Sequence, residues 1–318
     1  MRAVALVGAA LLLLATSGTA HAYPKPAALK GNVAAHDPSM IRSSSGYSVF
    51  STHNSIEIRR STDRVGFTRT GAALPSKPSW HFWYNVDGDA WAPDVSYHGG
   101  RYLLYYSVSS FGSNNSAIGL AVSRTAEPGT WVDQGIVYTS STWDNYNAID
   151  PSLLVDASGR WWLSFGSFWS GIHMIRIDPV TGKQSRTDTA RRHLALRPEG
   201  THAVEAPHIV RHGAYYYMFV SFDRCCARAE STYRIMVGRS TDPTGPYTDR
   251  AGVPMLNGGG TQILGTHGNI IGPGGQSVMR DGAEDVLVYH YYDGAAGGRE
   301  ALGLNRLGWD SQGWPYVR

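Results

Sequence analysis

The hydrophobic residues of the chain fall into short, aromatic-rich runs separated by turns that contain glycine or proline. Apolar and polar positions alternate within many of these runs, which is typical of half-buried β-strands. After residue 22, no helical periodicity is sustained over a dozen positions. The pattern therefore predicts an all-β protein built from many short strands.

One block of sequence recurs along the chain: an acidic residue and a proline, two or three apolar residues, a glycine-containing turn and an aromatic strand. Its copies occupy residues 37–50, 93–106, 150–165, 205–219 and, less clearly, 272–291. Their prolines, at positions 38, 93, 151, 207 and 273, lie 55 to 66 residues apart. A near-constant period of this length fits one four-stranded propeller blade per copy.

We therefore predict a five-bladed β-propeller that forms one domain over residues 23–318. A sandwich of unrelated hairpins is the alternative, but it would not produce a constant period. We expect the last blade to run to Trp309 and Trp314, and these residues to return to the first blade and close the ring.

The composition excludes several classes of protein. Of the 318 residues, 42% are hydrophobic and 17% are charged, so the chain is neither disordered nor fibrous. The formal net charge is only +3, which is too small to indicate a nucleic-acid-binding surface. The chain also lacks a dinucleotide-binding glycine motif, a phosphate-binding lysine loop and an H-E-x-x-H zinc motif.

Residues 1–22 have the features of a secretory signal peptide. A basic start is followed by an apolar run over residues 3–15 and by the small-residue ending Ala20-His21-Ala22. The run is shorter than the ~20 apolar residues of a membrane-spanning helix. We expect cleavage after Ala22 and a secreted protein that does not bind a membrane.

The two cysteines of the chain, Cys225 and Cys226, are adjacent. Exported proteins can form disulfides, but neighbouring cysteines can join only through a strained eight-membered ring. The sequence leaves two alternatives open, a vicinal disulfide and two free thiols.

Three of the repeats open with a carboxylate at what look like equivalent places: Asp37, Asp150 and Glu205. The innermost strand of each propeller blade starts near the central channel, so these side chains should converge. Carboxylates gathered in an apolar cleft repel one another, which raises the pKa of at least one. Although each residue alone could cap a turn, the three together favour a general acid and a general base.

A pair of carboxyl groups on different blades suits the hydrolysis of a glycosidic bond. Inverting enzymes separate the acid and the base by about 6.5–9.5 Å, whereas retaining pairs are about 5 Å apart. Carboxylates that face each other across a channel fit the wider spacing better. Aromatic residues near the repeat edges, such as Trp91, Phe168 and Trp169, are candidates for stacking on sugar rings.

Four motifs follow one another along the chain: His36-Asp37-Pro38-Ser39, Trp91-Ala92-Pro93-Asp94-Val95, Asn147-Ala148-Ile149-Asp150-Pro151-Ser152 and Glu205-Ala206-Pro207-His208. They resemble the motifs of glycoside hydrolase family 43, and within it those of the endo-1,5-α-L-arabinanases. Their order and their spread over the mature chain make the resemblance specific.

The resemblance implies an inverting endo-arabinanase on a five-bladed propeller. Asp37 would be the general base, Glu205 the general acid, and Asp150 the residue that tunes the pKa of Glu205 and orients it. The substrate would be arabinan, bound by a monomer. The sugar-binding cleft would be lined by Asp37, Trp91, Gly112, Asn147, Ala148, Ile149, Asp150, Ser167, Phe168 and Trp169.

The resemblance also implies a calcium ion, held near the channel axis by His267 together with water molecules. Calcium prefers oxygen ligands, so without the family His267 would be interpreted as a turn or core residue. Three functions remain open from the sequence: an endo-arabinanase, an exo-acting or xylan-directed enzyme of the same family, and a non-catalytic sugar-binding propeller. The third would predict the loss of one of the three carboxylates, and all three are present.

Overall fold

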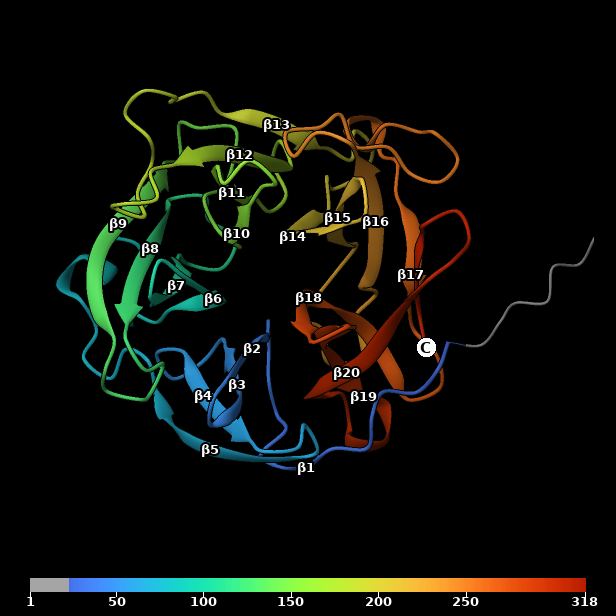
Figure 1. Cartoon of the computed structure of the whole chain (residues 1–318), viewed down its shortest axis with the longest axis horizontal. Helices are drawn as coiled ribbons and strands as arrows, with labels where there is room; N and C mark the ends of the chain where they lie inside the picture. The colour runs from blue at the N-terminus through green and yellow to red at the C-terminus, as the bar shows by residue number, and fades with distance from the viewer. Residues whose placement is uncertain (1–22) are drawn as a thin grey trace, which may run out of the picture.

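The computed structural model describes residues 23–318, which form five β-sheets arranged around a central channel (Figure 1). The predicted five-bladed propeller is therefore confirmed. The predicted signal peptide, residues 1–22, lies outside the described residues.

Each blade is built from four sequential antiparallel strands. The first contains β2 (Ser39–Ser43), β3 (Gly46–Ser51), β4 (Glu57–Ser61) and β5 (Gly66–Ala72). The second contains β6 (Trp91–His98), β7 (Arg101–Val108), β8 (Ser116–Ser123) and β9 (Val132–Ser140). The third contains β10 (Ser152–Val155), β11 (Trp161–Phe165), β12 (Ile172–Ile177) and β13 (Arg192–Ala195). The fourth contains β14 (Val204–His212), β15 (Tyr215–Phe222), β16 (Arg234–Ser240) and β17 (Thr261–Leu264). The fifth contains β18 (Ile270–Asp281), β19 (Glu284–Asp293), β20 (Arg299–Trp309) and β21 (Pro315–Val317).

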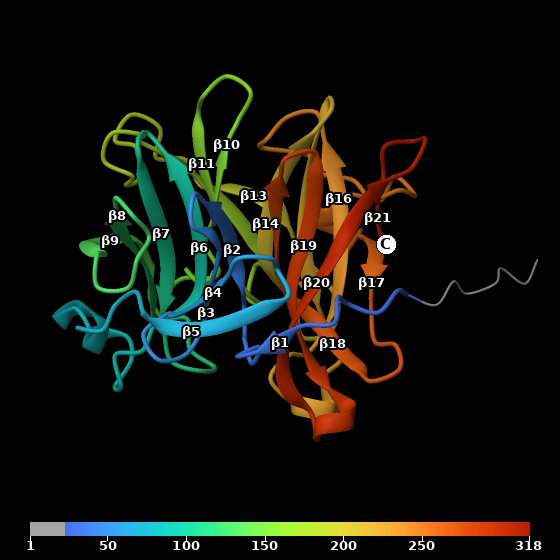
Figure 2. The ribbon, with the colours of Figure 1, turned by 60° about the horizontal axis from the view of Figure 1, so that its bottom comes forward.

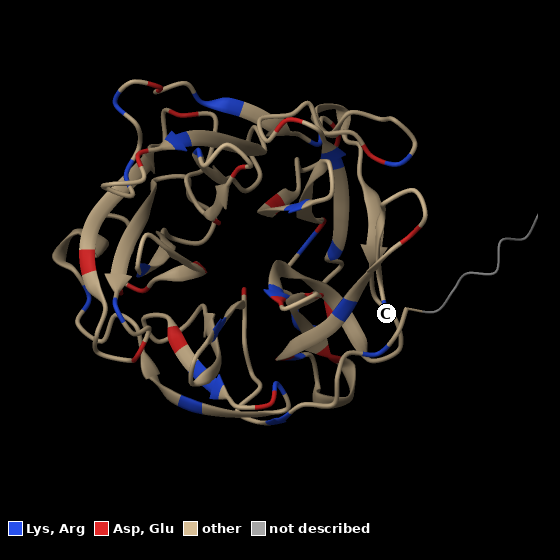
Figure 3. Cartoon of the chain, in the orientation of Figure 1, with Lys and Arg blue, Asp and Glu red and all other residues tan. Residues whose placement is uncertain are grey.

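Helical structure in residues 23–318 is limited to four short 3₁₀ turns. They are η1 (Ser79–Trp83), η2 (Arg228–Glu230), η3 (Met255–Asn257) and η4 (Gly294–Ala296). In this part of the chain, no helix is long and apolar enough to cross a membrane. Basic and acidic residues are distributed around the whole ring (Figure 3).

The fifth blade runs to Trp309 and Trp314 as predicted, but the ring is closed by the N-terminal segment, so the prediction that these residues return to the first blade is wrong. The strand β1 (Lys30–Gly31) pairs in parallel with β5 of the first blade. On either side of it, the Ala27 and Leu302 amides form hydrogen bonds that link residues 27–33 to β20 of the fifth blade. Figure 2 shows β1 running between these two blades. The C-terminal strand β21 instead completes the fifth blade, and Trp314 packs edge-on against Tyr217 of the fourth.

Polar side chains at the inner strands join neighbouring blades around the channel. Ser39 Oγ accepts a hydrogen bond from the Val95 amide, and Asp94 Oδ2 accepts one from the Leu153 amide. Three further contacts complete the circle: Ser152 Oγ with His208 Nδ1 (3.0 Å), Gln276 Nε2 with the Ala206 carbonyl (2.7 Å) and Ser277 Oγ with the Pro38 carbonyl (2.8 Å). This ring of bonds fixes the start of every inner strand, where the candidate carboxylates lie.

The heads of the inner strands share one backbone conformation. The residue before each repeat proline has a positive φ: Asp37 (45°), Ala92 (43°), Asp150 (57°), Ala206 (52°) and Gly272 (53°). Ala206 is therefore the equivalent of Asp37 and Asp150, and Glu205 comes one residue earlier. The prediction that the three carboxylates are at equivalent places is wrong in this respect, because Asp37 and Asp150 directly precede their prolines whereas Glu205 lies two residues before Pro207.

Candidate active site

A cleft of about 1330 Å³ opens at one end of the channel and is lined by residues from all five blades. Its volume exceeds the ~300–1,000 Å³ of typical small-molecule pockets, so it has room for several sugar units. Of the residues predicted to line it, Asp37, Trp91, Gly112, Asn147, Ile149, Asp150, Ser167, Phe168 and Trp169 do so, as does Glu205.

Ala148 is the exception, and its prediction as a cleft residue is wrong. Its side chain is fully buried in a core cluster formed by the second and third blades, and it does not line the cleft, whereas its neighbours Asn147 and Ile149 do. Asn147 lines the cleft, but its side-chain amide is already engaged by protein groups. Its Oδ1 accepts a hydrogen bond from Ser116 Oγ (2.7 Å), and its Nδ2 donates to the Ser113 carbonyl.

Glu205, on β14, is held by two hydroxyl groups. Ser167 Oγ donates to Oε2 at 2.5 Å, and Tyr233 Oη donates to Oε1. Burial raises the pKa of Glu205 to about 7, and the charge of Asp37 acts in the same direction, while the Ser167 hydrogen bond opposes the shift. Glu205 therefore keeps its proton in mildly acidic solution and can donate it.

Asp150 lies at the head of β10 and supports the backbone next to Glu205. Its amide donates to Ser107 Oγ (2.9 Å), and its Oδ2 accepts from the Ala206 amide (3.0 Å). Burial raises the pKa of Asp150 well above its usual range, and Glu205 and Asp37 add to the increase. This carboxyl group thus positions Glu205 through the next peptide unit.

Asp37 precedes β2 and is held on the opposite side of the cleft. Thr52 Oγ1 donates to its Oδ2 (2.9 Å) and accepts from the Ala92 amide (2.8 Å), so the direction of the hydroxyl proton is fixed. The Asp37 amide donates to His290 Nδ1 (3.1 Å). Gly275 (φ +55°) is required beside this group, because a Cβ there would collide with Asp37 Oδ1 and lie 2.7 Å from His290 Nδ1.

Three cleft residues near Asp37 were missed from the sequence: His36, His53 and Glu300. His36 Nε2 lies 3.5 Å from Asp37 Oδ2, and His36 Nδ1 lies 3.0 Å from Glu300 Oε1. Glu300 Oε2 also lies 3.2 Å from His53 Nε2. The position of His36 next to Asp37 in its motif was a usable signal, whereas Glu300 belongs to no motif.

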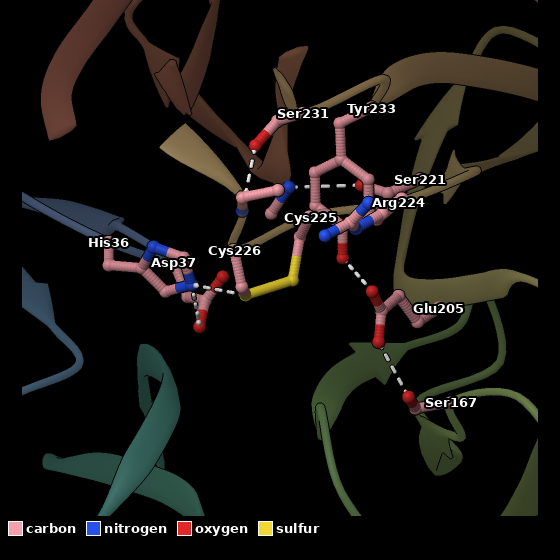
Figure 4. Close-up of a disulfide and its surroundings, with 12 residues drawn as sticks. His36, Asp37, Ser167, Glu205, Ser221, Arg224, Cys225, Cys226, Ser231 and Tyr233 are labelled. Atoms are coloured by element: carbon pink, nitrogen blue, oxygen red, sulfur yellow. Dashed lines mark hydrogen bonds and ion pairs between the residues drawn. A yellow bond between two sulfur atoms is a disulfide. The ribbon is translucent and has the colours of Figure 1, made fainter. Parts of the chain in front are cut away.

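Cys225 and Cys226 form a disulfide, which resolves the alternative left open by the sequence. Both residues line the cleft. Figure 4 shows the bond between the His36–Asp37 side and the Tyr233–Glu205 side of the cleft. The Cys226 amide donates to Tyr292 Oη (2.7 Å), which anchors this part of the wall to the fifth blade.

The structure places His267, the predicted calcium ligand, away from the channel axis, and the calcium ion itself stays a prediction. This histidine lies on the loop between β17 and β18, with its ring 5.6 Å from that of Tyr23, and lines neither the cleft nor the channel. Its Nδ1 donates to the Gly265 carbonyl (2.8 Å).

Within residues 23–318, His267 belongs to no group of three or more possible protein ligands, and its buried Nε2 forms no hydrogen bond with these residues. One cluster joins His36, Asp37 and His290, but it offers two nitrogens and one carboxylate, a poor set for calcium. His290 Nδ1 already accepts from the Asp37 amide.

The arrangement places a buried, protonated carboxyl group and a second carboxyl group on different blades of one cleft. Glu205 belongs to the fourth blade and Asp37 precedes the first. A proton donor and a proton acceptor on separate walls can act on the two sides of a bond between sugar units.

Comparisons with known proteins agree with this chemistry. The model of a family described as "Glycosyl hydrolases family 43" matches residues 31–315. The chain is 42% identical over 302 residues to the extracellular endo-alpha-(1->5)-L-arabinanase 1 of Bacillus subtilis, covering 92% of this chain and 91% of that one. It is 38% identical over 297 residues to an extracellular exo-alpha-(1->5)-L-arabinofuranosidase of Cellvibrio japonicus, covering 89% and 86%.

Solved structures give the same result. A GH43 endo-arabinanase from Bacillus licheniformis superposes with a TM-score of 0.85 at 45% identity, covering 91% of this chain and 99% of that one. The Cellvibrio cellulosa alpha-L-arabinanase complexed with arabinohexaose gives 0.86 at 36% identity, covering 90% and 96%. The chain is a glycosidase that belongs to glycosyl hydrolase family 43.

Proposed function

We propose that the protein is an extracellular endo-1,5-α-L-arabinanase that hydrolyses internal bonds of arabinan with inversion of configuration. The observation that carries this proposal is the pair of carboxyl groups, Glu205 and Asp37, on different blades of one large cleft. The similarity to arabinanases over nearly the whole chain supports the substrate class.

In the proposed mechanism, Glu205 donates its proton to the oxygen of the leaving sugar as the glycosidic bond breaks. Asp37 accepts a proton from a water molecule, whose oxygen attacks the anomeric carbon from the opposite side. Asp150 holds the backbone next to Glu205 through the Ala206 amide. The Ser167 and Tyr233 hydroxyls orient the Glu205 carboxyl group toward the cleft.

The remaining cleft residues would bind the sugar chain. Trp91, Phe168 and Trp169 present aromatic side chains to the cleft, and Gly112 and Ile149 line it as well. The loop that carries Phe168 is fixed by a hydrogen bond from its amide to the Val204 carbonyl, next to Glu205. This bond holds the Phe168 loop beside the strand that carries the proposed acid.

Action on internal bonds is supported by the size of the cleft and by the endo-acting relatives. A relative of comparable identity is named as exo-acting, so exo action is the second candidate. Linear 1,5-arabinan incubated with the enzyme, with products sized by chromatography over time, separates the two. We expect a ladder of oligosaccharides from the earliest times. Release of arabinose or of one short product from the outset would identify an exo enzyme.

The same time course includes two variants. Glu205→Gln should produce no ladder, whereas Glu127→Gln, on the outer side of the second blade beside Arg60, should produce the ladder of the wild type. Absence of any product from arabinan with the wild type would reject the substrate assignment.

Secretion is part of the proposal. The extracellular relatives support it, and cleavage after Ala22 is the sequence prediction for the export step. N-terminal sequencing of the protein recovered from the culture medium should begin at Tyr23, and an intact N-terminus would reject the predicted processing.

A further inference from the structure

The imidazole of His36 lies close to groups on both of its nitrogens and on one ring face. One ring nitrogen, Nε2, lies 3.5 Å from Asp37 Oδ2 and 3.9 Å from Cys226 Sγ, as the dashed lines in Figure 4 show. The other, Nδ1, lies 3.0 Å from Glu300 Oε1. One face of the ring stacks on His290, with centroids 4.0 Å apart and planes 21° apart. A side chain so enclosed is suited to holding its neighbours in place.

The charges around His36 alternate in sign. Burial alone would lower the pKa of His36, but Asp37 and the contact with Glu300 raise it to about 9. Burial opposes ionisation of Glu300, but His36 and His53 hold its pKa well below the usual range. His290 has the opposite shift, because burial and the charge of His36 lower its pKa.

Glu300 is therefore anionic and His36 cationic at neutral pH, with a neutral His290 stacked beneath the cation and the Asp37 carboxyl group 3.5 Å from it. The other titratable groups near His36 are His53, Tyr292 and Glu205.

We propose that His36 and Glu300 form a positioning pair for the general base: Glu300 orients the His36 imidazole, and the imidazole, 3.5 Å from Asp37 Oδ2, holds that carboxyl group toward the cleft. This inference rests on the proposed function, in which Asp37 is the base. Neither residue transfers a proton to substrate or water in this role.

The pair counteracts the repulsion among the carboxyl groups of the cleft. Asp37 shares the site with Asp150 and Glu205, and repulsion among the carboxyl groups helps to raise the pKa of Asp150 and of Glu205. The charge of His36, 3.5 Å from Asp37, acts against that repulsion and also lowers the pKa of Asp150 and of Glu205, although burial keeps both raised.

The kinetic test is the pH profile of kcat/KM on linear arabinan for His36→Gln. Loss of an adjacent opposite charge raises the pKa of a carboxylate by about 1–3 units. We expect the acidic limb of the profile to move to higher pH by at least about one unit. At pH values on the acidic side of the new limb, kcat/KM should therefore be roughly tenfold lower than in the wild type. The matched control is His212→Gln, which removes a histidine stacked on Trp309 and 3.7 Å from Asp285, at the outer end of β14. An acidic limb unchanged from that of the control would overturn the proposal.

A second measurement needs no change at His36 and applies even if that variant does not fold. The imidazole is titrated by NMR in the wild type, in Glu300→Gln and in the control Glu284→Gln. Glu284 belongs to the same blade, has the same 30% side-chain exposure as Glu300 and also contacts two cations, Arg64 and Arg306. We expect His36 to titrate above pH 8 in the wild type and in Glu284→Gln, and at least about one unit lower in Glu300→Gln. Titration below pH 7 in the wild type, or an identical midpoint in all three proteins, would overturn the pair.

Failure of the pair and failure of the proposed function are distinguishable. If Asp37→Asn abolishes arabinan hydrolysis while His36→Gln keeps the wild-type profile, the pair is rejected and the base assignment stands. If Asp37→Asn remains active, the base assignment is rejected, and the pair with it.

Discussion

The two sides of the cleft hold their carboxyl groups by different means. On the side of the third and fourth blades, Glu205 is buried and contacted by two neutral hydroxyls. On the side of the first and fifth blades, Asp37 lies between a threonine hydroxyl and a charged histidine, His36. Burial without a cation in contact retains a proton, whereas an adjacent cation favours its release. The difference shows how one cleft can contain an acid and a base at the same pH.

The largest expected effect comes from replacing either of the two proposed proton-transfer groups, Glu205 or Asp37. Glu205→Gln and Asp37→Asn should each lower kcat/KM on arabinan by about 10²–10⁴-fold, because each removes one proton-transfer group. Steady-state kinetics on linear arabinan measure the loss, with thermal unfolding to confirm that both variants fold. A loss below tenfold in either variant would contradict the assignment.

A smaller effect is expected at Asp150, which acts on the acid through the backbone. Asp150→Ala removes the acceptor of the Ala206 amide, and the loss of a buried hydrogen bond of ~1–3 kcal/mol corresponds to roughly 10–100-fold in kcat/KM. Asp150→Asn keeps an acceptor oxygen and tolerates the positive φ of this position. It should therefore retain about tenfold more activity than the alanine variant, and equal activities would contradict a positioning role.

The pH dependence should change with Ser167→Ala. The hydrogen bond from Ser167 opposes the rise in the pKa of Glu205, so its removal should raise that pKa above about 7. Because the protonated acid is the active form, kcat/KM falls as the pH rises through this pKa. The alkaline limb should therefore move to higher pH in the variant, while the acidic limb stays in place. A downward shift of the alkaline limb would contradict the assignment of Glu205 as the acid.

The smallest effect is expected at His267, which lies away from both sides of the cleft. His267→Ala should leave kcat/KM on arabinan within roughly twofold of the wild type, because the residue lines neither the cleft nor the channel. A loss of tenfold or more would show that the loop between β17 and β18 communicates with the site.

The number of blades was predictable because each inner strand begins with a proline at nearly constant spacing. The same repeat led to a wrong equivalence for Glu205, because the copies were aligned on their acidic residues and not on their prolines. The pair of His36 and Glu300 was not predictable, because 263 residues and four blades separate the two positions, and ring closure alone brings them together. The closure itself depends on β1, two residues whose sequence has no strand pattern.

The most direct test of the comparison between the two sides is the configuration of the first product. Hydrolysis of arabinohexaose is followed by ¹H NMR, which resolves the two anomers of the new reducing end before they equilibrate. An acid and a base on opposite walls predict that the β-anomer appears first, from an α-linked substrate. Initial release of the α-anomer would show that the configuration is retained, and would contradict the roles of Glu205 and Asp37.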